Sequence, residues 1–319
     1  MEIGDFYNAQ NGTSCPVAKL PHIETGYINN TKIMHVIISN SPFSATNYNF
    51  DVITLPRKNV CVNVELEDGE KNITPLDAAI MDAVYTLYCN GSNVFTAENV
   101  ARVMAADYKG SHKISDYRIQ TIVSSLKKLA SIRITIDCTD EYHVRKVQDI
   151  PKDRIKLTTY LLPLEEIEVI SGNQKRLHGY RLLKKPALYQ YAETVKQIMA
   201  VPIELLQIPG AENTEEMILL KRALITKIEL LRNAKNNVKN NNISYLYYDA
   251  KTGQQNGLFI AAGINPADNT PAGWKNKRSK LHKRVCLILD RYKQIGYIQG
   301  YDVRKLGEKK VIGVKIIID

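Results

Sequence analysis

The stretch "KLHKRVCLILDRYKQIGYIQGYDVRKLGEKKVIGVKIII", from Lys280 to Ile318, decides the fold that the sequence predicts. Its apolar residues recur at intervals of four and three, which is the spacing of one buried stripe on a helix. The stripe consists of Leu281, Val285, Ile288, Tyr292 and Ile295. Gly296 is a typical helix-ending residue. The alternating residues after it predict two strands around the turn "RKLGEKK".

Positive charge is concentrated at the start of this helix. Six of the ten residues from Lys275 to Arg284 are cationic. At about 100° per residue, Lys280, Arg284 and Arg291 fall on one face, which differs from the apolar stripe. The turn between the two strands is also basic. A helix with a cationic face and a basic hairpin after it predicts the recognition helix and wing of a winged helix-turn-helix domain.

A second segment upstream has the same layout. Thr74, Pro75 and Asp77 form a helix start before an apolar periodic run. Further helices are predicted after Thr96 and Ser115, and the third runs into the alternating segment "ASIRITID". Its apolar positions match those of the terminal helix at a constant offset of 163, as Ile122, Leu126, Leu129 and Ile132 against Val285, Leu289, Tyr292 and Ile295. We therefore predict two copies of one module.

The expected DNA contacts come from both modules. In the first, they are the polar residues on the outward face of the third helix: Tyr117, Arg118, Gln120, Thr121, Ser124 and Lys128. In the second, they are the cations of the terminal helix and hairpin: Lys275, Lys277, Arg278, Lys280, Lys283, Arg284, Arg291, Arg304, Lys305, Lys309 and Lys310. Most of these would contact phosphates. Base recognition is expected from Arg284, Arg291, Gln120 and Thr121.

The predicted fold class is α+β, with tandem winged helix-turn-helix domains behind a β-rich N-terminal arm. The arm covers residues 1–72, with strand candidates "KIMHVIIS" and "VCVNVEL". The first winged-helix domain covers 73–185 and includes an extended hairpin turning at Ser171, Gly172 and Asn173. A connector at 186–212 precedes the second domain at 213–319. In that domain we expect a long helix starting near Asn213 or Thr214 and a short helix at "LFIAAGI".

Composition indicates a cytoplasmic, soluble protein, and the expected DNA binding would associate it with the nucleoid. The 319 residues have no apolar run long enough for a membrane span. The five cysteines are scattered and contain no CxxC pair, which favours a reducing compartment. Residues 1–150 have a net charge of −3, from 14 cations and 17 anions, and residues 151–319 have +13, from 29 and 16. This asymmetry indicates a surface that faces a polyanion.

No catalytic or metal-ligating pattern is found, so we predict a protein that is not an enzyme and has no cofactor or metal. The six histidines form no HxH or HExxH spacing, and "KTG" at Lys251 lacks the rest of a phosphate-binding loop. The carboxylates at Asp137, Asp140 and Glu141 fit a solvated turn. Trp274 and the tyrosines at 245, 247 and 248 fit packing roles better than stacking on unpaired bases.

The layout resembles the replication initiators of plasmids and related mobile elements. The detailed likeness lies in the last forty or so residues, and the similar order of elements extends back to Ile73. The resemblance implies a protein that binds repeated double-stranded DNA sites at an origin, recruits host replication proteins and can form a homodimer. The N-terminal arm, the hairpin around Gly172 and the Asn-rich loop before the second module depart from the family pattern.

Other functions remain compatible with the sequence. The same two modules would serve a transcriptional repressor that binds a palindrome, because fold does not determine function. A different class of protein, with an RNA-binding or protein-interaction role for the basic helix, is also compatible. A nicking enzyme is the least favoured, because the tyrosines lack a paired-histidine metal site.

Overall fold

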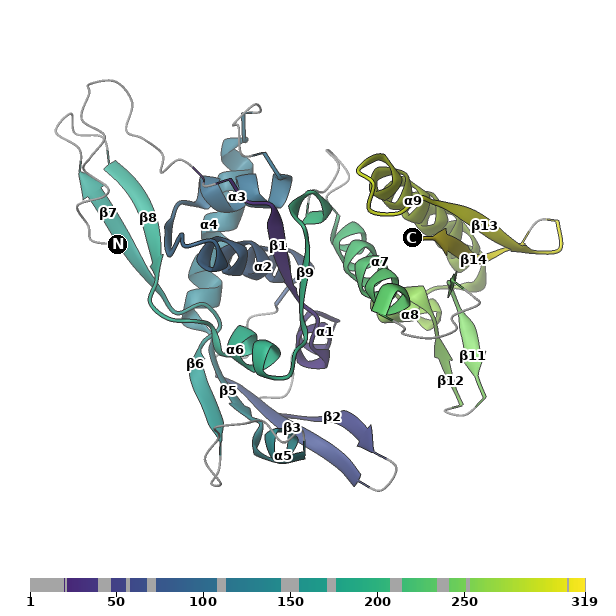
Figure 1. Cartoon of the computed structure of the whole chain (residues 1–319), viewed down its shortest axis with the longest axis horizontal. Coiled ribbons are helices and arrows are strands. Elements are labelled where there is room, and N and C mark those ends of the chain that lie inside the picture. Colours follow the sequence, from purple (N-terminus) through teal and green to yellow (C-terminus); the bar gives the residue numbers. More distant parts are fainter. Residues whose placement is uncertain are drawn as a thin grey trace. The chain divides into compact units, whose positions relative to one another are not determined.

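The chain divides into two compact units, Met1–Gln207 and Ile208–Asp319, and it is mixed α+β. The computed structural model describes residues 20, 22–39, 47–55, 58–67, 73–107, 113–144, 155–170, 176–206, 214–233, 241–250, 253–308 and 310–318 (Figure 1). The expected turn at Ser171, Gly172 and Asn173 and the cation Lys309 lie outside these ranges. The four-part division of the chain at 72, 185 and 212 stays a prediction.

The first unit has three antiparallel sheets and six helices among its described residues. Its helices are α1 (Lys32–Ser39), α2 (Pro75–Cys89), α3 (Ala97–Ala105), α4 (Asp116–Ser131), α5 (Thr139–Val144) and α6 (Ala187–Thr194), and a 3-10 turn, η2, covers Ile203–Leu206. Its strands are β1 (Thr25–Asn29), β2 (Asn47–Leu55), β3 (Lys58–Glu67), β4 (Val94–Phe95), β5 (Arg133–Asp137), β6 (Lys156–Tyr160), β7 (Leu164–Ile170), β8 (Arg176–Leu182) and β9 (Ile198–Pro202). The sheets have the orders β1-β9, β2-β3-β5-β6 and β4-β8-β7.

Two expectations for this unit are wrong. The segment "KIMHVIIS" is helix α1 and not a strand, because Ile33, Met34, Ile37 and Ile38 are buried at helical spacing and the Thr31 hydroxyl accepts from the Met34 amide at 3.2 Å. The predicted strand after α4 does exist as β5. However, β5 lies between β3 and β6 in the four-stranded sheet and does not form the expected wing.

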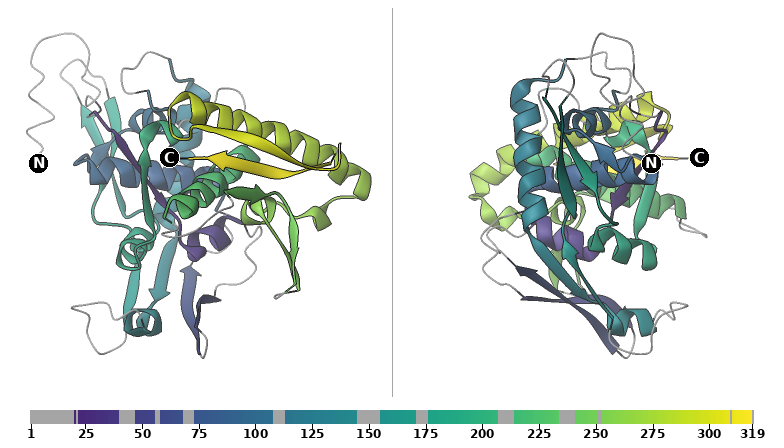
Figure 2. Two further views of the ribbon diagram at one scale, coloured as in Figure 1. Left: turned by 45° about the vertical axis from the view of Figure 1, so that its right-hand side comes forward. Right: turned by 90° about the vertical axis from the view of Figure 1, so that its left-hand side faces the viewer.

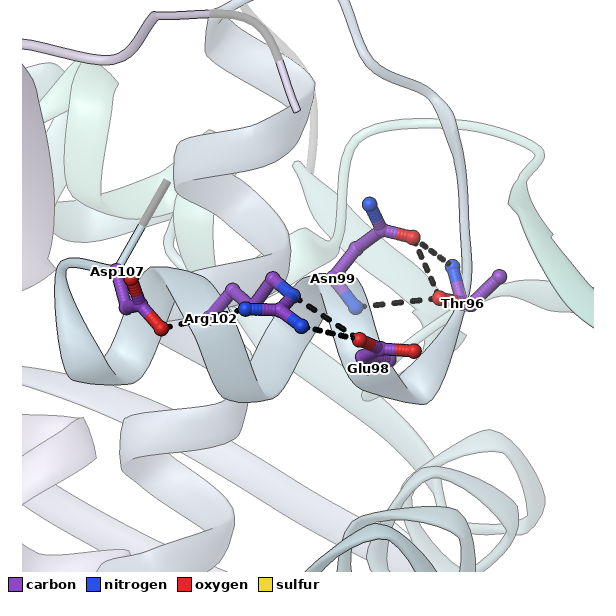
Figure 3. Close-up of polar contacts among 5 residues, drawn as sticks. All are labelled: Thr96, Glu98, Asn99, Arg102 and Asp107. Atoms are coloured by element: carbon purple, nitrogen blue, oxygen red, sulfur yellow. Dashed lines mark hydrogen bonds and ion pairs between the residues drawn. The ribbon is translucent and has the colours of Figure 1, made fainter. Parts of the chain in front are cut away.

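Helix starts in the first unit follow the predicted capping chemistry. Thr74 caps α2 and exchanges hydrogen bonds with Asp77, as expected. Thr96 caps α3, and the Asn99 side chain accepts from the Thr96 amide at 2.9 Å (Figure 3). Arg102, one turn further along α3, bonds to Glu98 at 2.5 Å and to Asp107 at 3.2 Å. These contacts fix both ends of a helix of only nine residues.

A buried polar centre joins the N-terminal segment to α2 and α6. The Asp82 carboxylate on α2 accepts from the Asn29 amide at 3.0 Å and from the Tyr189 hydroxyl at 2.7 Å. The Asn29 side chain donates to the Leu188 carbonyl at 3.0 Å. Pairing of β1 with β9 extends the same connection over residues far apart in sequence. A buried carboxylate is tolerated here because its oxygen is hydrogen-bonded.

The second unit contains one three-stranded sheet, a small hairpin and three helices among its described residues. Its helices are α7 (Glu215–Asn233), α8 (Leu258–Ala261) and α9 (Pro271–Gln294), with a 3-10 turn, η4, at Pro266–Asp268. Its strands are β10 (Asn242–Ser244), β11 (Tyr247–Asp249), β12 (Gln254–Asn256), β13 (Gly300–Leu306) and β14 (Lys310–Ile317). The helices predicted near Thr214 and at "LFIAAGI" are confirmed as α7 and α8.

The core of the second unit forms between α7, α9 and the sheet. The apolar stripe predicted on α9 is confirmed for four of its five residues, and Leu289 joins it. Ile295 differs because it lies at the helix C-cap and is half-buried. Gly296 follows with a φ of +74°, a conformation that favours glycine. The expected hairpin is present as β13–β14.

Both units repeat one order of elements, which is helix, strand, helix, helix and hairpin. In the first unit these are α2, β4, α3, α4 and β7–β8, and in the second they are α7, β10, α8, α9 and β13–β14. In each sheet the last strand lies between the other two, as β4-β8-β7 and β10-β14-β13. The segment β5-α5-β6 is an insertion after α4, and β11–β12 is an insertion after β10. The true counterpart of the terminal hairpin is therefore β7–β8.

Candidate nucleic-acid interface

The first ten residues of α9 are rich in cations and pack little against the rest of the unit. None of the residues from Pro271 to Lys280 is buried, and the first buried side chain is Leu281. Trp274 is half-buried and lies edge-on to Phe259, with ring centroids 6.1 Å apart. A helix segment that carries several like charges and buries so few side chains is stabilised only weakly by contacts within its own unit. Packing therefore does not account for the concentration of cations in this segment.

The predicted cations of the second unit fall into two groups. Those with exposed side chains are Lys275, Lys280, Lys283, Lys305 and Lys310. The others are half-buried, and each has an ion pair or a hydrogen bond within the unit: Lys277, Arg278, Arg284, Arg291 and Arg304. Figures 1 and 2 show the β13–β14 hairpin lying along α9, so the two elements present their cations on one unit.

An acidic residue on α7 neutralises part of the α9 charge. Glu216 pairs with Lys277 at 3.0 Å and also with Arg284. All three side chains remain partly exposed, and an exposed ion pair stabilises by only about 0–1 kcal/mol. Arg284, a candidate for base recognition, thus has a carboxylate partner within its own unit.

Two further arginines have hydrogen bonds to the β10-β14-β13 sheet. The Arg278 guanidinium donates to the Val311 carbonyl at the start of β14. Arg304 Nη1 lies 3.4 Å from the Ser244 hydroxyl oxygen, which ties β13 to the end of β10. Both contacts leave other N–H groups of each guanidinium for a further acceptor. Arg278 on α9 and Arg304 on β13 are therefore donors that contacts within the unit hold in place.

A cavity of about 320 Å³ lies between α9 and the start of β14. Its described lining consists of Tyr245, Lys275, Arg278, Ser279, His282, Lys310 and Val311. Tyr245 is buried, and its hydroxyl oxygen lies 2.8 Å from His282 Nδ1. Burial, and then the nearby Arg278 charge, lower the pKa of His282, so its imidazole is neutral at pH 7. Sequence analysis missed Ser279 and His282 because neither belongs to a motif.

In the first unit, α4 presents an exposed polar face. Tyr117 is 84% exposed, and Gln120 and Ser124 are exposed next to it. The Thr121 hydroxyl donates to the Tyr117 carbonyl at 2.8 Å, and the Ser124 hydroxyl donates to the Gln120 carbonyl at 2.9 Å. Each hydroxyl oxygen can still accept a hydrogen bond. A large exposed aromatic ring on such a face is a candidate contact residue.

Lys128 and Arg118 differ from the outward-facing side chains expected on α4. Lys128 is half-buried and forms an ion pair with the buried Asp77 carboxylate at the start of α2. It therefore joins two helices of its own unit. Arg118 is also half-buried, and burial lowers the pKa of its guanidinium, which stays protonated at neutral pH. The apolar residues Ile119 and Val123 of the same helix are half-buried.

The expected packing role of the aromatic residues is correct for Tyr245, which stacks on Phe259 with centroids 4.8 Å apart. For Tyr247 and Tyr248 this expectation is wrong, because both lie on β11 with exposed side chains. Within the described ranges, no group of three or more His, Cys, Asp or Glu side chains is arranged to hold a metal ion. Of the helices in that part of the chain, none combines the length and apolar character required to cross a bilayer.

Comparison with known proteins gives matches at the level of structure alone. Neither a protein family nor a curated protein matches the sequence. Two crystal structures of domains 2 and 3 of RctB are similar, one of them a selenomethionine derivative. The derivative is 12% identical, with a TM-score of 0.44 over 89% of this chain and 96% of that chain. The other is 10% identical, with a TM-score of 0.46 over 90% and 96%.

Proposed function

We propose that this protein binds double-stranded DNA through two winged-helix modules. The repeated order of helix, strand, helix, helix and hairpin supports the modules, together with the central position of the last strand in each sheet. In this arrangement α4 and α9 are the recognition helices, and β7–β8 and β13–β14 are the wings. The observation that carries the proposal is the start of α9, because its first ten residues, Pro271 to Lys280, are rich in cations and none of them is buried.

Phosphate contacts are assigned chiefly to the second module. Exposed lysines on α9 and the wing would displace counterions from the duplex, which makes binding strong at low salt and weak at high salt. Half-buried Arg278 and Arg304, held by the wing sheet, would position the duplex. Lys277 and Arg284 would exchange Glu216 for phosphate on binding.

Base recognition is assigned to a small number of side chains. Gln120 on α4 is exposed and of a type that pairs bidentately with adenine. Arg284 and Arg291 on α9 are of the type that pairs with guanine, and each such pair discriminates by about 1–3 kcal/mol. Thr121 and Tyr117 complete the polar face of α4.

We further propose that the protein is a replication initiator of a plasmid or another mobile element, and that it has no catalytic activity. The resemblance of its last forty or so residues to such initiators supports this role. It would bind repeated origin sites and recruit host replication proteins. Footprinting on the DNA that flanks the gene tests the role. Protected direct repeats beside an AT-rich tract would support an initiator, and one protected palindrome over the promoter would support a repressor.

Substitution of two exposed lysines tests the DNA-binding surface. For Lys280→Gln/Lys283→Gln we expect duplex affinity to fall about tenfold and the salt slope to decrease by about 2, because each phosphate contact contributes about 0.9. The control is Lys293→Gln/Lys315→Gln, which removes the same charge from exposed positions of α9 and β14 outside the proposed set. Fluorescence anisotropy at several salt concentrations gives both quantities. Equal effects of the two variants would show that only net charge matters.

A further inference from the structure

The cavity between α9 and β14 concentrates positive charge without an internal counter-charge. Lys275, Arg278 and Lys310 line it, and none of its described lining residues is Asp or Glu. His282 adds no charge at pH 7, because burial lowers its pKa. Three cations that converge on one cavity repel one another, and a bound anion would offset that repulsion.

Three of the side chains around the cavity, Arg278, Tyr245 and His282, are held by hydrogen bonds. Arg278 donates to the Val311 carbonyl, so its guanidinium is fixed at the junction of α9 and β14. Tyr245 forms a buried wall, with its hydroxyl engaged by His282 at 2.8 Å. Ser279 contributes a hydroxyl that can either donate or accept. An anion entering the cavity therefore meets one donor that is already positioned, the Arg278 guanidinium, with Lys275, Ser279 and Lys310 around it.

We infer that this cavity binds a phosphate group together with the organic part of a nucleotide. A phosphate monoester carries about −1.5 to −2 charges at pH 7, which matches three cations better than a carboxylate does. Arginine binds phosphate through parallel N–H bonds, and lysine adds a point charge. The volume of about 320 Å³ falls in the range of about 300–1,000 Å³ that is typical of small-ligand sites, so the cavity has room beyond the phosphate itself.

Two sources would supply such a group: a nucleotide of bound DNA or a free nucleotide. The first case rests on the proposed function, and the second does not. Trp274 precedes Lys275 and is the single tryptophan of the chain, so its fluorescence reports on this part of α9. The probes are AMP and inorganic phosphate, with acetate as a carboxylate control at equal ionic strength.

The test compares Lys275→Gln/Lys310→Gln with the matched control Lys293→Gln/Lys315→Gln. If free nucleotides use the site, AMP will change Trp274 fluorescence saturably and acetate will not, and the cavity variant will bind AMP at least about tenfold more weakly. If only DNA uses it, AMP and phosphate will have no effect. The cavity variant will then lose more duplex affinity, and more of the salt slope, than the control.

Other outcomes overturn the inference. In the first, neither AMP nor phosphate binds and the two double variants have equal duplex affinity. In the second, the two double variants lose AMP binding to the same extent. Circular dichroism shows whether each variant is folded. Wild-type protein that binds AMP at the cavity but no duplex would refute the proposed function and leave the phosphate site standing.

Discussion

His282 links the packing of α9 to the candidate ligand cavity. Its Nδ1 lies 2.8 Å from the Tyr245 hydroxyl oxygen, and the Cys286 sulfur lies 3.7 Å away. Burial and the Arg278 charge both disfavour the imidazolium, which lowers the pKa of His282. Burial also raises the pKa of Cys286 and of Tyr245, so both groups are neutral near pH 7. Arg278 is therefore the charged side chain whose repulsion adds to burial in lowering the pKa of His282.

The lowered pKa predicts a pH-dependent stability of the second unit. In the unfolded chain His282 takes up a proton near its ordinary pKa of 6.5, whereas in the folded chain it resists protonation. The free energy of unfolding should therefore fall as the pH drops below 6.5, since the unfolded state binds more protons there. Urea unfolding followed by Trp274 fluorescence measures this between pH 7.5 and 5.5. His282→Gln should reduce the pH dependence, and an unchanged dependence would contradict the assignment.

At the scale of elements, α7 moderates the charge of α9. Glu216 on α7 holds both Lys277 and Arg284, and its side chain is one-third exposed. The pairs would have to open if these cations were to contact DNA. This arrangement would reduce non-specific binding to polyanions, because the single Glu216 charge offsets part of the charge of two α9 cations in the free protein.

Removal of that carboxylate should strengthen DNA binding. In Glu216→Gln, Lys277 and Arg284 are released, so we expect higher duplex affinity and a salt slope steeper by up to about 2. Glu215→Gln is the matched control, since it removes one negative charge from the preceding exposed position. Affinity measured from low to high salt distinguishes them. Weaker binding in Glu216→Gln would instead indicate that Glu216 orients Arg284 for base contact.

At the scale of the whole molecule, two modules in one chain predict a dependence on DNA length. A duplex of about 12 base pairs accommodates one module, whereas one of about 30 has room for both. Because the second contact is then intramolecular, affinity should rise at least about tenfold beyond the statistical number of sites. Anisotropy measurements on duplexes of increasing length check this. If the affinity instead increased only in proportion to the duplex length, a single module would be binding DNA.

Much of the local structure could be predicted from the sequence because its causes are local. Thr74 with Asp77 and the Gly296 helix end depend on neighbouring residues, and each lies where it was expected. The charge of α9 is likewise a property of the chain itself. The predicted buried face of α9 is also confirmed for four residues, because apolar residues at intervals of three and four lie on one side of a helix and do not fit a strand.

Tertiary structure alone decided which strands pair and which charges are free. β5 has the alternation of a wing strand, but hydrogen bonding to β3 and β6 places it in another sheet, while β7–β8 joins β4. The Lys128 ammonium and the Arg284 guanidinium have carboxylate partners 51 and 68 residues away. Helix caps and periodicity come from residues close in sequence, whereas sheet order, ion pairs and the cavity depend on residues that only folding brings together.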